Sequence, residues 1–512
     1  MSARGGTGSG RMGHPGLITL SVMAATVMQA LDTTIANVAL PHMQGSFSVA
    51  QDQITWVLTS YIVAAAIATP LTGWLATTYG TKRLLLMSIA GFTVASLLCG
   101  VAGSIYQMVF YRFVQGICGA ALVPLAQSVL IDINPPSKQG SAMALWGAGV
   151  MLGPILGPTL GGWLTDHYNW RYVFYINLPI GILAFAGLML FLRETAQNRR
   201  SFDFFGFAML SLGVGALQMM LDRGQLKDWL SSTEICVELA LAITGFWVFL
   251  VHSATSRNPF INLAIFKDRN FAAGQVLMFM IGVVLYASTA LLPTLLQELY
   301  DYPVVAAGWL MTPRGIGTMA SMLVVGRIAN KVDVRILMLA GFCVTGYSFW
   351  MPTHWSLQMG WQPFVWAGIG QGIGMGLLFV PLSLSCFGTL QPQFRNEGTA
   401  IYSLVRNVAG SIGISVAEAY LARSIQTNHQ IIAAQVTPFN GALQNPSIAA
   451  FWNTHSLPGL SALNAEVTRQ ATMIAYLDNF MLMAVISVCA IPLLILMRRI
   501  NPHRGRAPAV AE

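Results

Sequence analysis

Two oppositely charged residues, Asp32 and Arg112, each lie inside a long apolar run of this sequence. At about 1.5 Å per helical residue, Asp32 is about 14 Å from the end of its run and Arg112 about 10 Å from the end of its own. An ionised side chain at the centre of a bilayer costs about 2.5–3.5 kcal/mol on insertion scales, so each group needs a partner. A carboxylate at this depth indicates either a buried polar contact between helices or a site for a proton or a ligand. We favour the second interpretation.

The helical faces that carry Asp32 and Arg112 also carry other polar side chains. Gln29 and Thr33 share the face of Asp32, and Gln115 shares that of Arg112, because residues three or four apart are neighbours on a helix. We therefore predict one buried polar centre in which Arg112 stays charged, since a guanidinium does not titrate in proteins. If Asp32 meets Arg112 in one conformation and leaves it in another, its proton affinity changes. Such a change would couple proton binding to a conformational equilibrium.

Several other residues at membrane depth are candidates for the same function. Glu298, near Asp301, is either a solvated helix end or an external gate for proton entry, whereas Glu418 and Asp478 are more consistent with solvated helix ends. Aromatic residues of membrane proteins often form interfacial belts, but some of those in this sequence could line a cavity. Together with Gln29, Thr33 and Gln115, we expect the following residues to line a substrate cavity: Trp56, Tyr61, Tyr286, Gln297 and Asn407.

The composition indicates an all-α polytopic membrane protein. Of 512 residues, 55% are hydrophobic and only 9% are charged, and the mean hydropathy is +0.62. The net charge of +8 could indicate a nucleic-acid partner, but the basic residues lie in short loops between apolar runs, which is typical of membrane topology. The six cysteines have no paired spacing, and there is no P-loop, metal-binding motif or catalytic triad. We therefore predict no enzyme activity, no cofactor and no metal site.

The apolar runs predict about fourteen transmembrane helices. We place them at 16–42, 52–78, 82–103, 105–133, 138–163, 169–194, 203–222, 230–254, 269–300, 303–330, 333–353, 361–388, 396–426 and 472–499. About nineteen basic residues lie on the side of both termini and about four on the other side, which predicts cytoplasmic termini. The tails are 1–15 and 500–512. The segment 427–471 is expected to be a long external loop with some local structure.

The two halves of the chain resemble each other. Three short motifs recur about 256 residues later, in parallel orientation: Gly73 as Gly326, Gln115 as Gln371 and Gly140 as Gly398. The repeat predicts two six-helix bundles, at 16–197 and 261–499, with two linker helices inserted at 198–260. Substrate sites of such proteins lie between the repeats near mid-membrane. We expect a mostly apolar site lined by helices 1, 2, 4, 5, 9 and 13, with helices 7 and 8 outside it.

A glycine-rich loop motif joins helices 2 and 3 and contains Gly73, Gly80, Lys82 and Arg83. The glycines allow close helix approach and a tight turn, and the basic residues suit an anionic membrane surface. The motif resembles the loop signature of the major facilitator superfamily, G-x-L-x-D-x-x-G-x-[RK]-[RK], with Thr77 in place of the acidic residue. This difference puts in doubt the charge-relay latch that the acidic residue supplies in many relatives.

Helix 5 carries a second motif rich in small residues: Gly149, Gly153, Pro154, Gly157, Pro158, Gly161 and Gly162. Proline kinks a helix, and a glycine face lets a neighbouring helix pack closely. The pattern G-P-x-x-G-G resembles the antiporter signature of drug-extruding members of the superfamily. We predict that this face is needed for alternating access, and that Gly157 lies where another helix slides or seals.

Further motifs extend the resemblance over essentially the whole membrane region. R-x-x-Q-G at Arg112 resembles a signature of the superfamily's proton-coupled members. L-D-x-T-I-x-N-V-A-L-P at Asp32, the opening of helix 6 at Trp170 and the run from Arg406 to Gly413 in helix 13 are similar to the EmrB/QacA-type drug:proton antiporters. The resemblance implies a fourteen-helix transporter of the bacterial inner membrane that exports small hydrophobic compounds with the proton gradient as its energy source. Relatives of the EmrB subgroup work with a periplasmic adaptor protein and an outer-membrane channel. The alternatives are a dedicated exporter of one endogenous metabolite and a non-transporting membrane sensor.

Overall fold

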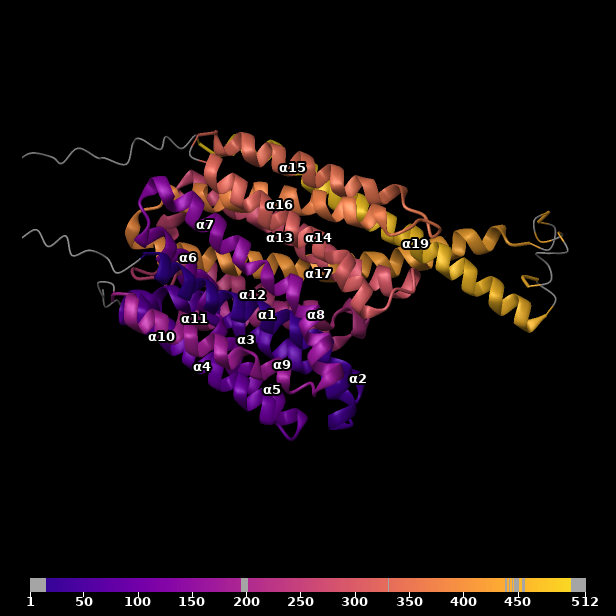
Figure 1. The fold of residues 1–512 in the computed structure, drawn as a ribbon, viewed down its shortest axis with the longest axis horizontal. Helices are drawn as coiled ribbons and strands as arrows, with labels where there is room; N and C mark the ends of the chain where they lie inside the picture. Colours follow the sequence, from indigo (N-terminus) through magenta and orange to yellow (C-terminus); the bar gives the residue numbers. More distant parts are fainter. Residues whose placement is uncertain are drawn as a thin grey trace, which may run out of the picture.

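The computed structural model describes residues 15–194, 201–329, 331–437, 440–441, 443, 445, 451–453 and 456–498. These residues are helical apart from turns and connections, and none of them forms a strand. The long helices lie side by side along one direction, and the first half of the chain packs against the second (Figure 1). Such helices suit a membrane because their backbone groups bond within each helix. The all-α membrane fold expected from the sequence is confirmed.

The N-terminal bundle contains the first six crossings, several of which are divided by a break. Its helices are α1 (Pro15–Phe47), α2 (Gln51–Ile54), α3 (Trp56–Tyr79), α4 (Thr81–Val101), α5 (Ile105–Gly119), α6 (Leu122–Ile133), α7 (Pro136–Val150), α8 (Leu152–His167), α9 (Tyr172–Tyr175) and α10 (Asn177–Phe191). Helices α5 and α6 together form the predicted fourth crossing, and α7 and α8, which meet at Met151, form the fifth.

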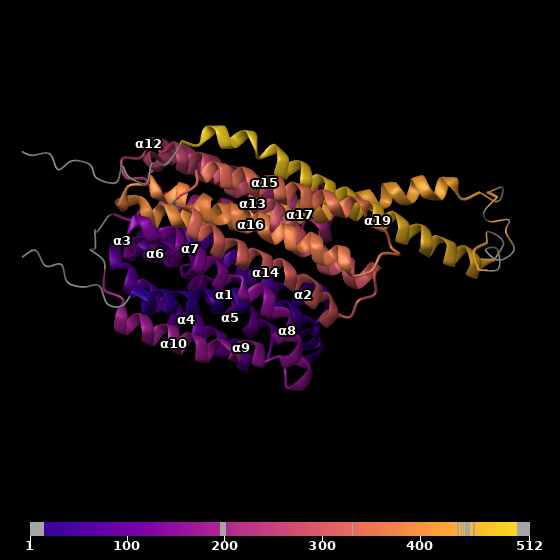
Figure 2. The ribbon, with the colours of Figure 1, turned by 45° about the horizontal axis from the view of Figure 1, so that its top comes forward.

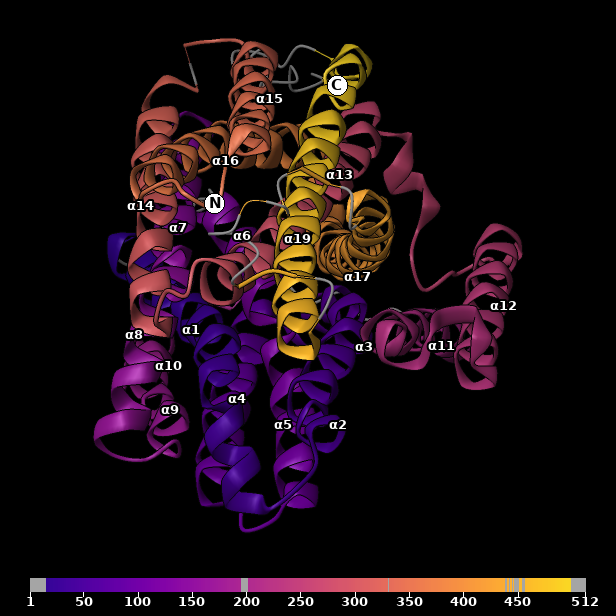
Figure 3. The ribbon, with the colours of Figure 1, turned by 90° about the vertical axis from the view of Figure 1, so that its right-hand side faces the viewer.

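Two inserted helices and the C-terminal bundle follow. They are α11 (Phe204–Arg223), α12 (Thr233–Thr255), α13 (Arg269–Thr294) with its π-helical end Leu295–Leu299, α14 (Val304–Ile328), α15 (Val334–Trp350), α16 (Gln362–Gly388), α17 (Arg395–Gln435) and α19 (Leu457–Cys489). Short 3₁₀ turns lie at Gln225–Lys227, Trp229–Ser231, Leu263–Lys267, Met351–His354, Pro392–Phe394 and Pro492–Leu496. Helix α11 packs against α3 and α17, and α12 lies outside α11 at one side of the molecule (Figure 3).

The number of crossings agrees with the sequence prediction. Within the described residues, thirteen helical segments are long and apolar enough to span a membrane. Helix α14 is the fourteenth: it has 25 residues and packs along α16, but Arg314 and Arg327 make it less apolar than the others. The fourteen-helix fold is therefore present.

Helices α17 and α19 project together beyond the rest of the molecule (Figures 1 and 2). Helix α17 has 41 residues, which corresponds to about 61 Å, whereas the apolar core of a bilayer is about 30 Å thick. In the projecting pair, His429 Nε2 lies 3.0 Å from Asn464 Oδ1, and Leu463 and Val467 are buried. The structure differs here from the loop expected at 427–471, because 427–435 continue α17 and 457–471 begin α19.

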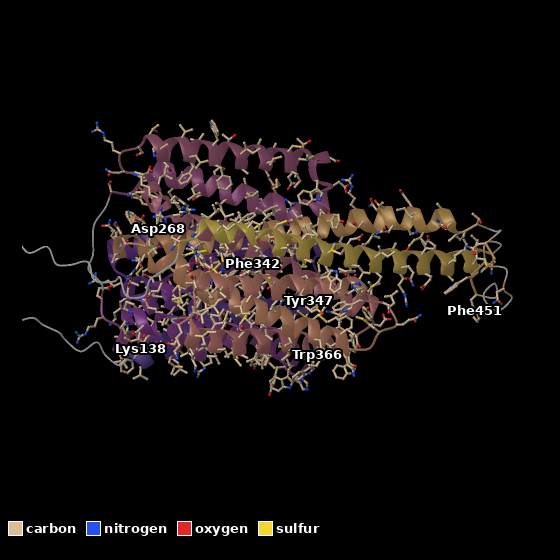
Figure 4. All side chains as sticks on the ribbon, turned by 90° about the horizontal axis from the view of Figure 1, so that it is seen from above. Lys138, Asp268, Phe342, Tyr347, Trp366 and Phe451 are labelled. Atoms are coloured by element: carbon tan, nitrogen blue, oxygen red, sulfur yellow. The ribbon has the colours of Figure 1, made fainter. Side chains whose placement is uncertain are left out.

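Several helix-capping carboxylates lie at the opposite end of the molecule. Asp203, Asp268 and Asp333 accept hydrogen bonds from backbone N–H groups in the first turns of α11, α13 and α15. Figure 4 shows Lys138 and Asp268 at the end opposite Phe451, which lies near the tip of the projecting pair. We refer to these two ends of the molecule as the Lys138 end and the Phe451 end. The sequence predicts that the Lys138 end faces the cytoplasm.

Thiol labelling in intact cells tests this orientation. In a background without the native cysteines, Lys138→Cys should be protected from a membrane-impermeant maleimide and Asn440→Cys should react. Both positions are exposed to solvent or lipid in the structure, so protection would reflect the membrane side and not burial in protein. Permeabilised cells, in which both cysteines should react, provide the control. Labelling of position 138 alone in intact cells would show that the topology is the reverse of the predicted one.

Candidate functional site

Asp32 lies at the centre of a closed polar cluster in the N-terminal bundle. Its Oδ2 atom is 2.6 Å from Nη1 of Arg112, and the two side chains are 0% and 1% exposed. Its Oδ1 atom accepts hydrogen bonds of 2.9 Å from Nε2 of Gln115 and from Nδ2 of Asn177. Donors from α5 and α10 therefore converge on one carboxylate of α1. This arrangement suits the ionised form of Asp32, which only accepts hydrogen bonds.

The guanidinium of Arg112 is held on several sides. Its Nε donates to the backbone oxygen of Val57 on α3 at 3.2 Å, and Nη1 also donates to Oε1 of Gln115 at 2.8 Å. The rings of Tyr61 and Phe174 lie 4.4 Å and 5.8 Å from its Cζ atom, within the range of a cation–π contact. The predicted contact of Asp32 with Arg112 is present, and helices α1, α3, α5 and α10 build its surroundings.

Two members of this cluster were not among the residues predicted from the sequence. Asn177, the first residue of α10, bonds both Asp32 and Oγ of Ser96. Ser96 on α4 in turn donates to the backbone oxygen of Phe174 at 2.9 Å. The available signal was the helix-6 motif, in which Asn177 precedes an apolar helix.

The glycine face of α8 packs directly on α1 beside this cluster. A Cβ atom on Gly157 would lie only 2.0 Å from Oγ1 of Thr34, which is two residues from Asp32. Thr34 also donates to the backbone oxygen of Gly153 across the two helices at 3.1 Å. Other glycines of the motif make similar contacts: Gly149 with Met23, Gly153 with Ala30, and Gly161 with Ile35. Gly162 differs, because no atom lies within 4 Å of its Cβ position.

The opposite side of α8 contacts the C-terminal bundle. A Cβ atom on Gly315 of α14 would meet Ile155, and one on Gly308 would lie 3.9 Å from Pro158. Gly157 itself therefore faces α1 within its own bundle, while its neighbours Ile155 and Pro158 face the other bundle. Helix α8 is thus inserted between the helix that carries Asp32 and helix α14.

Comparison with known proteins agrees with this architecture. The model of the Major Facilitator Superfamily matches residues 22–414. This chain belongs to that superfamily. It is 35% identical to the multidrug export protein EmrB of Escherichia coli over 477 residues, which cover 91% of this chain and 92% of EmrB. It is 34% identical to the fatty acid resistance protein FarB of Neisseria gonorrhoeae, with coverages of 93% and 94%. Within the superfamily, the chain is therefore of the EmrB multidrug-efflux type.

Solved structures share the fold of this superfamily member at low sequence identity. The human organic anion transporter MFSD10 aligns with a TM-score of 0.63 and 13% identity, covering 94% of this chain and 99% of its own. An inward-facing bacterial homologue of the lysosomal transporter Spinster aligns with a TM-score of 0.54 and 16% identity, with coverages of 96% and 97%. Superfamily membership makes the chain a membrane transporter and not an enzyme. Among the described residues, no group of His, Cys, Asp and Glu side chains could hold a metal ion.

The two bundles of this superfamily member meet at the Lys138 end. Nη1 of Arg395 on α17 lies 2.6 Å from Oδ1 of Asp132 on α6, and Ser128 donates to Oδ1 of Asn396 at 2.5 Å. A Cβ atom on Gly73 of the loop motif would lie 2.9 Å from Cα of Glu397. These contacts join α3 and α6 to the first turn of α17. Asp132 thus forms an ion pair between the bundles at the end where the loop signature lacks its acidic residue.

The rest of the loop motif is organised by a carboxylate from the end of the sixth crossing. Glu194 accepts 3.1 Å hydrogen bonds from the backbone N–H groups of Lys82 and Arg83, at the start of α4. Gly80 adopts φ +96, and a Cβ atom there would overlap the Glu194 carboxylate. Thr77 donates within its own helix, to the backbone oxygen of Gly73. The close approach of Glu194 therefore requires a glycine at position 80.

The remaining candidates are not part of the Asp32 cluster, except that Tyr61 lies against Arg112 and Gln29 lies beside Tyr61. The Tyr286 ring packs where a side chain on Gly410 would lie, and Trp56 lies 5.3 Å from the guanidinium of Arg223. Trp56 and Tyr286 are half-buried, as are Thr33, Gln297 and Asn407, whereas Glu298 is exposed in the π-helical end of α13. Their roles in substrate or proton binding stay predictions.

Proposed function

We propose that this transporter exports small hydrophobic compounds in exchange for protons, and that it lies in the inner membrane of a bacterium with both termini in the cytoplasm. The observation that supports this proposal most strongly is the buried ion pair of Asp32 and Arg112, within 2.6 Å and closed to solvent. Titratable residues inside a membrane are energetically costly, and those that occur there usually serve a function.

The hydrogen bonds of Asp32 suggest how a proton could drive the exchange. In the arrangement seen here, both carboxylate oxygens face donors only: Arg112, Gln115 and Asn177. A protonated Asp32 would turn a donor toward another donor, so proton uptake requires the cluster to open. Because α8 packs on both α1 and α14, movement of α1 away from Arg112 would be transmitted to the C-terminal bundle. Proton uptake from outside and release inside would then alternate with drug export.

The names of relatives support export but leave the range of substrates open. EmrB is named for multidrug export and FarB for fatty acid resistance. A dedicated exporter of one metabolite is therefore the second candidate, and a membrane sensor is the third. A periplasmic adaptor and an outer-membrane channel are the partners that the resemblance to the EmrB subgroup implies. The projecting part of α17 and α19 is the part of the described chain that would reach such an adaptor.

Proton flux in proteoliposomes tests the function. With a proton gradient imposed across vesicles that hold the purified full chain, ethidium and chemically unrelated neutral and anionic drugs should each accelerate proton movement and be transported uphill. Empty liposomes are the control for passive leak. Proton movement with one compound class alone would favour the dedicated exporter. No movement with any compound would contradict antiport.

A further inference from the structure

A second buried cation, Arg314, lies near the middle of α14 in the C-terminal bundle. It is 8% exposed. Among the described residues, its guanidinium makes one hydrogen bond, from Nη2 to the backbone oxygen of Leu285 on α13 at 3.3 Å. Its Nη1 atom is buried and has no partner. A buried charge is normally paired, so this guanidinium has unused donors in an apolar region.

The one hydrogen bond does not account for the position of Arg314. The backbone oxygen of Leu285 already accepts from the hydroxyl groups of Thr289 at 2.7 Å and Ser288 at 2.9 Å. The Arg314 bond to it is at the long end of the range for N–H···O contacts. A purely structural role for Arg314 would require better partners than a carbonyl that other donors have occupied.

The internal repeat indicates which kind of partner Arg314 lacks. In the N-terminal bundle, Arg112 bonds Asp32 and Gln115. In the second repeat, Gln371 corresponds to Gln115, and its buried Oε1 has no partner. Gly368 corresponds to Arg112, and a Cβ atom there would lie 3.6 Å from Cβ of Arg314, so the residue that carries the cation in this bundle comes from the neighbouring helix α14.

The counterpart of the Asp32 carboxylate is missing. Helices α13, α14 and α16, which surround Arg314, contain no Asp or Glu within their bounds. The buried residues of α13 and α16 are mostly apolar. Arg314 therefore lies in an apolar setting, and the three helices around it provide no anion as its partner.

We propose that the substrate supplies this anion: Arg314 binds the carboxylate or sulfonate head group of an amphiphilic organic anion, whose apolar body lies against α13, α14 and α16. This inference rests on the proposed function and names its substrate class. The planar guanidinium offers paired donors that match such a head group, and the low-polarity surroundings strengthen the bond. In this proposal the N-terminal bundle binds the proton at Asp32, and the C-terminal bundle binds the anionic head group at Arg314.

Binding of matched ligands with a ten-carbon chain tests the proposal. Decanesulfonate, decanol and decyltrimethylammonium are titrated calorimetrically into the full chain in nanodiscs, with empty nanodiscs subtracted. The wild-type protein should bind decanesulfonate at least tenfold more tightly than the cation. Arg314→Gln should weaken decanesulfonate binding about 10- to 100-fold and leave decanol binding within about threefold. Arg314→Lys should retain part of the affinity, and Arg327→Gln, which removes an exposed charge from the same helix, should change neither.

The outcomes separate this proposal from the proposed function. Equal loss of decanol and decanesulfonate binding in Arg314→Gln would show a structural role and overturn the anion site. If Arg314→Gln does not fold, equal affinity of the wild-type protein for the anion and the cation would overturn it as well. Ethidium-driven proton flux without Arg314-dependent anion binding would reject the anion site alone. Arg314-dependent binding without proton flux for any compound would support the site and reject antiport.

Discussion

Asp32→Asn should abolish drug export against a gradient and the release of protons on drug binding, while the protein remains folded and able to bind drug. Asparagine has nearly the same size and keeps an acceptor oxygen toward Arg112, 2.6 Å away in the native pair, while its NH2 group would face the donors of Gln115 and Asn177 and open the cluster locally. The side-chain amide of asparagine does not bind or release a proton near neutral pH. Without a titratable group at this position, proton binding could no longer bias the conformational equilibrium.

The measurement is drug-induced proton release from detergent-solubilised protein, with uphill export in proteoliposomes as the second readout. Asp166→Asn is the matched control, because Asp166 is an exposed acid in the last turn of α8. Arg112→Lys should also be a poor substitute, since lysine lacks the rigid guanidinium in which Nη1 bonds Asp32 and Gln115 while Nε bonds the backbone oxygen of Val57. If Asp32→Asn still releases protons and still exports uphill, Asp32 is structural and Glu298 or Asp478 becomes the coupling candidate.

Gly157→Leu should insert normally and lose at least nine-tenths of its drug export. Even a single Cβ atom at this position would lie 2.0 Å from Oγ1 of Thr34, so a leucine must push α8 away from α1 beside Asp32. Overpacking of this kind costs about 1–3 kcal/mol, which a well-packed bundle tolerates. The displaced α1 would disturb the Asp32 cluster and the contact of α8 with α14, so a proton leak is a further expected effect.

The sequence motif provides its own control for this variant. Gly162→Leu changes another glycine of the same helix, but no atom lies within 4 Å of its Cβ position. It should keep nearly normal export in the same vesicle assay, at matched protein levels. Normal export by Gly157→Leu would show that α1 and α8 do not need this close contact, and loss in both variants would indicate a general effect of added bulk.

The polar centre was predictable as far as its two charges and Gln115, which shares the helical face of Arg112. The constant rise of a helix places Asp32 and Arg112 at similar depths, and each needed a partner at that depth. Asn177 and Ser96 were not predictable in the same way, because many polar residues occur in these helices. The relative rotation of the helices decides which of them face Asp32, and this rotation depends on close packing such as that of Gly157 on Thr34.

Other features depended on neighbours that a single sequence does not identify. Arg314 is visible as a lone cation in an apolar run, but its missing partner becomes apparent only when α13 and α16 are known to surround it. Residues 427–435 and 457–471 are too polar for a membrane span, which favoured a loop. They are helical in the structure, where α17 and α19 pair and bury Leu463 and Val467 between their neighbours.

The length of α17 has a mechanical consequence. One helix without an internal proline runs from the ion pair of Arg395 with Asp132, at the Lys138 end, to His429 in the projecting pair. Helices bend gently and kink mainly at proline, at Gly/Ser pairs or at inserted groups, and Gly410-Ser411 is the one such pair within α17. A rotation of about 10° about the Arg395 end would therefore displace the far end by about 10 Å, given the length of about 61 Å. If α17 moves as one rigid body, opening of the bundles at one membrane surface would therefore become a larger displacement beyond the other surface.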